Sequence, residues 1–417
     1  MSMKLLWLCN SIPGVIRAHK TGKPASAVNW VDHVLSGLRE RGFQIRILCR
    51  GSEAMGILDE TCSYRCFGEE LSHEYHPDLE KLFRVELRSF KPDVIHSWGV
   101  EYDHCLAMVN AAEAEGMLPQ MVASIQGLCA VLAEHYTDGI PDVVAKKSTF
   151  RDLMRRDNIK AQQQKFVLRG KHEQEAVQKL SHVIGRTAWD KKHTADWNPE
   201  ITYHFCNETL RENFYEGQWS YEGCKKHRIF APGCNYPIKG FHLLLEAFAE
   251  VLKDYPDATL AVPGRAPFAD DLKTRLRQGS YEAYLSSQMR QKGLEDKILF
   301  LGSLTVEKMK EAFLESNVFV LPSAMENSPN TLGEAMLLGV PCVASDVGGV
   351  RDLLEEGREG LIYPSLDTVK LAEHIKAVFA MEDKAADMGL EAQAHARKTH
   401  DPEKNLQDLI TIYESLC

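Results

Sequence analysis

Short apolar runs alternate with longer amphipathic stretches along the whole chain. Runs such as KLLWLC at residues 4–9, QIRILCR at 44–50 and KPDVIHSW at 91–98 predict buried strands. The stretch at residues 27–41 has apolar residues three and four positions apart, which predicts a helix that Gly42 ends. This order of strand, helix and strand is typical of a doubly wound α/β domain built on a parallel sheet.

The same order begins again after an irregular polar region at residues 207–226. A strand starting at Arg228 leads through a loop into a long amphipathic helix, and further strands are expected at ATLAVPG, KILFLG and NVFVLPS. A chain of 417 residues is too long for one ordinary core. We therefore predict two α/β domains, at residues 1–210 and 211–399.

Residues 318–354 predict a strand, a polar turn, a helix and a second strand, with two carboxylates placed between them. Glu326 is expected in the turn after the first strand, and Glu334 in the first turn of the helix. The segment NSPNT between them offers helix-capping side chains followed by free backbone N–H groups, which favour a phosphate. A carboxylate beside such a site is suited to accept hydrogen bonds from sugar hydroxyls. The expected backbone donors belong to Asn330, Thr331 and Leu332.

The composition is that of an ordinary globular protein, with 44% apolar and 26% charged residues. A net charge of −10 argues against general nucleic-acid binding, which requires a basic surface. The eleven cysteines are scattered without a CxxC pair, which indicates reduced thiols and a cytoplasmic protein. No segment has the length of apolar residues that a membrane span needs, and the start of the chain resembles a first strand more than a signal peptide.

Residues 146–171 are strongly basic within this acidic chain. Nine lysines and arginines face only Asp152 and Asp157, and apolar residues such as Phe150 and Met154 recur at roughly helical intervals. An amphipathic basic segment of this kind can lie on an anionic membrane surface, on the inner face of the cell membrane. A solvated helix face that happens to be basic explains the pattern equally well.

The residues around Glu326 and Glu334 also resemble a known family. The pattern PS-x2-EN-x6-EA-x3-G-P-V-SD-GG is similar to the E-x7-E region of retaining glycosyltransferases of family four, which have the GT-B fold. The resemblance implies two Rossmann-like domains facing a cleft, with a final helix at about 400–417 that packs back on the first domain. It implies that Glu326 lies beside the donor sugar, that Glu334 binds the nucleotide ribose, and that Ser303 lies beside the base.

The loop before the long helix of the second domain ends in Lys239-Gly240. A nucleotide-binding P-loop would need a glycine before Lys239 and Ser or Thr after it, so that interpretation fails. The loop instead resembles the family motif G-R-x4-K-G, whose Arg and Lys neutralise the departing diphosphate. Cys234 stands where the Arg is expected. The resemblance therefore implies a substitute cation, and Arg265 and Arg186 are the candidates.

Three features of the first domain are expected to face the cleft. Gly14 lies in the long polar loop after the first strand, where the family contacts the donor phosphates, although this loop lacks the usual Gly-Gly pair. Gln126-Gly127 occupies the place of a family His that contacts the donor sugar, so that role would pass to Gln126, His96 or His135. A buried, hydrogen-bonded ring is the alternative for His96, and a structural ion pair is the alternative for Arg186.

The resemblance implies a hexosyltransferase that uses a nucleotide diphosphate sugar, needs neither metal nor cofactor, and retains the anomeric configuration. The acceptor would be a saccharide or a lipid-linked saccharide. A GT-B sugar-nucleotide epimerase or a phosphorylase is the competing enzyme class. A non-catalytic sugar-nucleotide-binding subunit is the competing non-enzymatic function, since the missing Arg and His would suit it.

Overall fold

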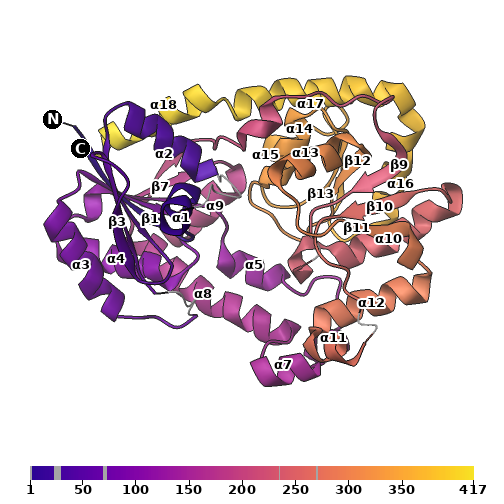
Figure 1. The fold of residues 1–417 in the computed structure, drawn as a ribbon, viewed down its shortest axis with the longest axis horizontal. Helices are drawn as coiled ribbons and strands as arrows, with labels where there is room; N and C mark the ends of the chain where they lie inside the picture. The colour runs from indigo at the N-terminus through magenta and orange to yellow at the C-terminus, as the bar shows by residue number, and fades with distance from the viewer. Residues whose placement is uncertain (1, 23–29, 69–72, 234, 269–270) are drawn as a thin grey trace. The chain divides into compact units, whose positions relative to one another are not determined.

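The protein divides into two compact units, each built on its own sheet (Figure 1). The computed structural model describes residues 2–22, 30–68, 73–233, 235–268 and 271–417. The first unit comprises Met1–Val131, Phe166–Arg211 and His400–Cys417, and the second comprises Leu132–Lys165 and Glu212–Thr399. The segment Leu132–Lys165, which the sequence places in the first domain, thus groups with the second unit.

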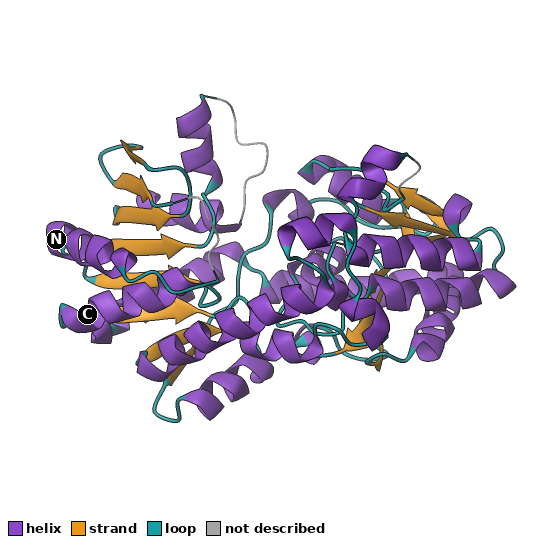
Figure 2. Cartoon of the chain, turned by 90° about the horizontal axis from the view of Figure 1, so that it is seen from below, coloured by secondary structure: helices purple, strands orange, loops and turns teal. Residues whose placement is uncertain are grey.

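The first unit contains an eight-stranded sheet in the order β3-β4-β2-β1-β5-β6-β7-β8. All neighbouring strands are parallel except β3 and β4. Helices flank the strands (Figure 2). The strands are β1 Lys4–Cys9, β2 Gln44–Cys49, β3 Ala54–Ile57, β4 Cys62–Cys66, β5 Val94–Trp98, β6 Met121–Ser124, β7 His182–Gly185 and β8 Thr202–Phe205. The helices are α1 Gly14–Thr21, α2 Trp30–Glu40, α3 Asp78–Phe90, α4 Asp103–Ala114, α9 Ala188–Trp197 and α18 Pro402–Ser415.

The last helix, α18, belongs to the core of the first unit. Its residues Leu406, Leu409 and Tyr413 join the cluster formed by apolar residues of β1, β2 and α2. Asp401 caps the helix by accepting the amide of Lys404 at 2.8 Å. Both ends of the chain therefore lie in the same unit.

The second unit contains a six-stranded parallel sheet in the order β11-β10-β9-β12-β13-β14. The strands are β9 Lys225–Phe230, β10 Thr259–Val262, β11 Ile298–Phe300, β12 Ser316–Leu321, β13 Cys342–Asp346 and β14 Leu361–Pro364. The helices are α6 Asp142–Lys146, α7 Phe150–Arg155, α10 Phe241–Asp254, α11 Leu272–Arg277, α12 Ser280–Lys292, α13 Val306–Leu314, α14 Asn330–Leu337, α15 Val350–Leu353, α16 Thr368–Met381 and α17 Ala385–Thr399. Two of the four boundaries between the units fall inside α5 Cys129–His135 and inside α8 Ile159–Lys179. The prediction of two doubly wound α/β domains is confirmed.

One local expectation was wrong. The polar loop after β1 contains the helix α1, whose first two amides, of Gly14 and Val15, donate to the Asp32 carboxylate at 3.0 and 3.1 Å. The basic segment is helical, as its spacing indicates, and it comprises the end of α6, α7 and the start of α8. Residues 23–29, where the sequence lacks the Gly-Gly pair and where the next helix was expected to begin, lie outside the described residues.

Candidate functional site

Glu326 lies in the turn after β12, as the sequence predicts, and it forms an ion pair with Lys239. The Lys239 Nζ and the Glu326 Oε1 are 2.6 Å apart. Ser323 donates its hydroxyl to the same carboxylate oxygen at 2.7 Å. Glu326 is largely buried, whereas the Lys239 side chain is about one-third exposed. The pair therefore presents a partly accessible ammonium group whose position a buried carboxylate fixes.

A close approach between two loops brings Lys239 to this place. Gly240 has φ +66°, and a Cβ added there would lie 1.8 Å from the carbonyl oxygen of Pro322. The amide of Ala324 donates to the Ile238 carbonyl at 2.8 Å. Only glycine fits this contact, so the Lys-Gly pair joins the loop after β9 to the loop after β12.

A third loop, the one after β13, holds the Glu326 backbone. Gly348 has φ +52°, and a Cβ there would lie 1.6 Å from the Glu326 carbonyl oxygen. The Gly349 amide donates to the carbonyl of Asn327 at 3.1 Å. The strands β9, β12 and β13 are neighbours in the sheet, so the three loops meet at its carboxyl edge. That edge is where open α/β sheets bind their ligands.

The start of α14 differs in part from its prediction. Pro329 is the N-cap residue, and no side chain caps the helix. The Leu332 amide donates to the Pro329 carbonyl at 2.9 Å, so it is not available to a ligand. Asn330 and Thr331 remain as predicted donors in the first turn. Glu334 lies in the second turn rather than the first, and its side chain is buried.

Arg265 and Ser303 lie in two turns that are joined to each other. Gly264 and Gly302 exchange backbone hydrogen bonds of 2.8 and 3.0 Å, which link the turns after β10 and β11. Both predicted residues are exposed, and no described carboxylate pairs with Arg265. Cys234 lies outside the described residues.

The first unit has a cavity of about 290 Å³ at the ends of its central strands. The lining comes from the segments that follow β1, β5 and β6, together with α2, and it includes the predicted residue Gln126. Polar and aromatic side chains mix there. The full lining is Cys9, Asn10, Ser11, Pro13, Val31, Trp98, Glu101, Tyr102 and Gln126.

Glu101 is fixed in this cavity by a chain of hydrogen bonds. The Arg50 Nε donates to the His104 Nδ1 at 3.0 Å, so the His104 Nε2 carries the proton that bonds the Asn10 Oδ1 at 2.8 Å. The Asn10 amide then donates to the Glu101 Oε2 at 2.8 Å. Burial and the nearby Arg50 hold the pKa of His104 well below its usual value, so the ring stays neutral. Burial raises the pKa of Glu101.

The sequence did not predict this series of hydrogen bonds, because the residues that form it are far apart in the sequence. Gly99 gave the one local signal, since glycine directly after a strand marks a close backbone approach. Its φ is +120°, and a Cβ there would meet the side chains of Asn10 and Glu101.

Two other predicted contacts of the first unit are structural. His96 is fully buried, with its two ring nitrogens 2.6 Å from the Tyr413 hydroxyl and 2.8 Å from that of Ser124. Burial lowers the pKa of His96 to about 3, so the ring is neutral and held in the core. Arg186 is buried and pairs with Glu208 at 2.8 Å. Of the alternatives that the sequence left open, the structure favours the buried ring and the structural ion pair.

Gln126 and His135, the other proposed sugar contacts, are engaged locally. Gln126 donates to the same Glu208 carboxylate, while remaining part of the cavity lining. His135 lies 2.8 Å from the Asp138 carboxylate. Gly14 begins α1 with its amide bound to Asp32, so that amide is not free to bind a phosphate.

The described residues contain no group of three or more His, Cys, Asp and Glu side chains arranged to hold a metal ion. They also contain no helix that is both long enough and apolar enough to cross a membrane.

Residues 225–395 match the family model described as "Glycosyl transferases group 1". The matched residues lie within the second unit. Similar proteins include the lipopolysaccharide core biosynthesis mannosyltransferase LpsB of Rhizobium meliloti, 29% identical over 43% of this chain and 48% of that protein. A phosphatidyl-myo-inositol mannosyltransferase of Mycobacterium leprae is 27% identical over 45% of this chain and 46% of that protein. The chain spans about half the length of the curated relatives it matches.

Solved structures extend the likeness to the whole chain. A sucrose-phosphate synthase from Thermosynechococcus elongatus aligns with a TM-score of 0.72 at 14% identity, covering 99% of both chains. Anabaena Alr3699/HepE in complex with UDP-glucose aligns with a TM-score of 0.69 at 17% identity, covering 99% of this chain and 100% of that chain. At these low identities the structural likeness shows the fold alone, which is that of the GT-B glycosyltransferases, as the sequence predicts.

Proposed function

We propose that the protein is a retaining glycosyltransferase that moves a hexose from a nucleotide diphosphate sugar to a saccharide or lipid-linked acceptor. The observation that carries the proposal is the ion pair of Lys239 and Glu326, at the junction of three loops within the segment that matches the family. An ammonium group held by one carboxylate keeps two N–H donors for a further anion. A diphosphate is the anion that such a place at a sheet edge would take.

The proposed chemistry breaks the bond between the sugar C1 and the diphosphate oxygen. The bonding electrons pass to the diphosphate oxygen. The acceptor hydroxyl forms the new bond to C1 on the same face of the sugar and gives its proton to that leaving oxygen. Lys239 and the amides of Asn330 and Thr331 at the start of α14 would stabilise the growing negative charge. Arg265 would supply the second cation in place of the family Arg, because it is exposed and close to the loop after β9. Glu326 would accept hydrogen bonds from donor hydroxyls, and Glu334 would anchor the ribose.

The cavity of the first unit is the proposed place of the acceptor. Glu101, Asn10 and Gln126 offer hydrogen-bond partners for hydroxyl groups, and Tyr102 and Trp98 add aromatic side chains to the lining. Carbohydrates are bound by this combination because they carry hydroxyls on one side and C–H groups on the other. We propose that the reaction needs no metal and no resident cofactor.

The first experiment is a thermal-shift screen of the full chain against UDP-, GDP- and ADP-sugars, since a ligand that binds only the native state raises the apparent stability. Turnover of the donor that binds is then measured by nucleotide release, and the anomeric configuration of the product by NMR. Lys239→Ala and Glu326→Ala should each lower turnover by about a hundredfold or more, because each removes a charge-assisted contact to the reacting donor.

Lys292→Ala is the matched control, since Lys292 forms an ion pair of the same 2.6 Å length with Glu246 elsewhere in the second unit. It should leave turnover unchanged. Full turnover in Lys239→Ala would refute the site. Donor binding without turnover under all conditions would refute the enzyme and favour the non-catalytic subunit, and release of an epimerised sugar nucleotide would favour the epimerase.

A further inference from the structure

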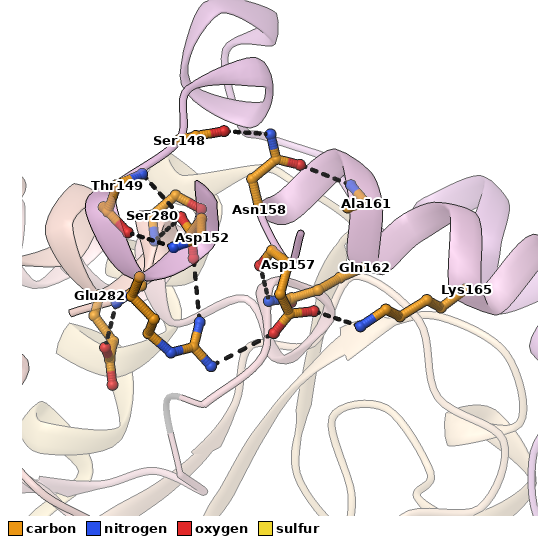
Figure 3. Close-up of polar contacts among 12 residues, drawn as sticks. Ser148, Thr149, Asp152, Asp157, Asn158, Ala161, Gln162, Lys165, Ser280 and Glu282 are labelled. Carbon is orange, nitrogen blue, oxygen red and sulfur yellow. Dashed lines mark hydrogen bonds and ion pairs between the residues drawn. The ribbon is translucent and has the colours of Figure 1, made fainter. Parts of the chain in front are cut away.

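Helix α7 is built with its polar side toward the protein. Thr149 and Asp152 form a capping box at its start (Figure 3). Asp152 is only 2% exposed. The Asp152 carboxylate also accepts the backbone amide of Ser280, at the start of α12, at 2.9 Å. A buried carboxylate must be paired to be tolerated, and here the amides and Arg151, at 3.1 Å, pair it. The anchor of α7 is therefore a polar contact and not an apolar one.

The apolar residues of the same helix point outward as a consequence. Leu153 is 69% exposed and Met154 is 73% exposed, and the Phe150 ring is also more than half exposed. Helix α11 packs beside α7 (Figure 1). It adds Leu272 and Leu276, which are one helical turn apart and also exposed. Large apolar side chains exposed on two adjoining helices mark a candidate place where another surface is bound.

Basic side chains stand next to these apolar side chains in the sequence of both helices. Arg155 and Arg156 follow Met154, and every residue of α11 is exposed, including its basic ones. No ion pair in the described part of the chain involves any of these cations. They are Arg155, Arg156, Lys273, Arg275 and Arg277. Five basic side chains on and beside two adjoining helices, with Asp271 as the acidic neighbour of Arg277, favour an anionic partner in a protein of net charge −10.

The local structure holds this surface in place. Asp157, in the turn between α7 and α8, accepts from Lys165 at 2.7 Å and from Arg151 at 3.4 Å (Figure 3). Asn158 caps α8 by accepting the amide of Ala161 at 2.8 Å. Arg151 and Lys165 thus hold the turn between α7 and α8 through Asp157. Because both are paired, they are not counted among the exposed cations of the surface.

We propose that the outer surface of α7 and α11 docks on an anionic lipid membrane, with its apolar side chains among the acyl chains and its cations at the headgroups. A basic helix with exposed apolar residues binds the bilayer interface because its apolar side chains are buried there and its cations are attracted to the anionic headgroups. A second copy of the chain would place like charges opposite each other, which is unfavourable. A nucleic acid would use the cations and leave the apolar residues in water.

The test is flotation of the full chain with vesicles of phosphatidylcholine alone or mixed with phosphatidylglycerol. Binding is expected only with the anionic lipid, and it should weaken as salt rises from about 0.1 M to about 1 M, because the Debye length falls from roughly 10 Å to 3 Å. The double variant Arg155→Gln, Arg156→Gln should bind about 30-fold more weakly, since each cation near such a surface contributes about fivefold.

Further variants test whether the apolar side chains contribute to lipid binding, and control variants test whether replacing an exposed side chain elsewhere has the same effect. Leu153→Ser with Met154→Ser should lower binding at least as much as the loss of the two arginines. Val369→Ser is the matched apolar control, since Val369 is 63% exposed on α16, and Lys398→Gln is the charge control on α17. Both controls should bind like the unchanged protein. All replaced side chains are exposed, so circular dichroism and the thermal transition should not change.

Equal binding to both vesicle types, or wild-type binding by both double variants, would overturn the proposal. A concentration-dependent dimer that the Leu153→Ser, Met154→Ser variant loses would assign the surface to a second copy instead. Displacement from vesicles by single-stranded RNA with no effect of the apolar variant would assign it to nucleic acid. Lys239→Ala should still float with anionic vesicles, so failure of the proposed activity and failure of docking are distinguishable.

Discussion

Replacing Gly348 by alanine tests how the loop after β13 holds Glu326. Gly348 has φ +52°, so an alanine pays the cost of the left-handed region, about 1–2 kcal/mol. Its Cβ would also lie 1.6 Å from the Glu326 carbonyl oxygen, whereas ordinary contact begins at 3.4 Å. The Glu326 backbone would therefore have to move by almost 2 Å, or the loop would have to open.

A second glycine separates these two costs. Gly357 has φ +76°, and a Cβ there would meet nothing within 4 Å. Gly357→Ala should destabilise the protein by about 1–2 kcal/mol through backbone strain alone. Gly348→Ala adds a steric cost typical of overpacking, about 1–3 kcal/mol, so it should destabilise by roughly 2–5 kcal/mol.

The assay is urea unfolding of both variants, followed by donor turnover. Because a misplacement of about 1 Å at a reacting centre can cost a hundredfold in rate, Gly348→Ala should lose at least that much turnover while still folded. Gly357→Ala should keep its turnover. Equal destabilisation and equal turnover in the two variants would refute the claim that the Gly348 contact positions Glu326.

Two more predictions follow from the charges of the two units. The pKa of His96 is lowered to about 3, against about 6.5 unfolded, so the unfolded state binds more protons between these values. The contribution of His96 to the free energy of unfolding should be complete above pH 6.5 and lost as the pH falls toward 3. When unfolding is measured at pH 7 and at pH 4, the free energy of unfolding should therefore decrease less in His96→Asn than in the unchanged protein. Arg265→Ala should lower turnover by about tenfold to a hundredfold with no change in unfolding, if Arg265 supplies the second cation; unchanged turnover would return that role to another residue.

Local patterns predicted the elements that carry the second-unit site. The strand at Lys4–Cys9 has the bounds that its apolar run indicates, and Glu326 follows β12 as expected. Lys239 and Glu326 are far apart in the sequence, yet each could be predicted as a site residue because each lies in a short motif of its own. Their contact at 2.6 Å was not predictable from spacing, since it depends on the fit of Gly240 against Pro322.

The first-unit site was less predictable because its chemistry rests on long-range pairs. The first amides of α1 donate to Asp32, which lies on a different helix, α2. Because that partner is separate in the sequence, the sequence alone indicates a polar loop where α1 lies. Glu101 has no motif of its own, and its place depends on His104 and Asn10. His96, in contrast, looked like a cleft residue because it ends a strand, but Tyr413 of the last helix covers it.

In the basic segment, the helical spacing of the apolar residues was correct, but it did not show which side of helix α7 faces the protein. An amphipathic helix is normally read with its apolar side toward the core, but in α7 the carboxylate of Asp152 takes that place and the apolar residues face out. Of the cations counted in the sequence, Arg151 and Lys165 bind Asp157, and Arg169 donates to the Glu101 carbonyl at 2.9 Å. The outer charge therefore depends on α11 as much as on α7. Since α11 is distant in the sequence, a peptide of residues 146–171 alone would lack half of the surface, and its lipid affinity should fall below that of the full chain.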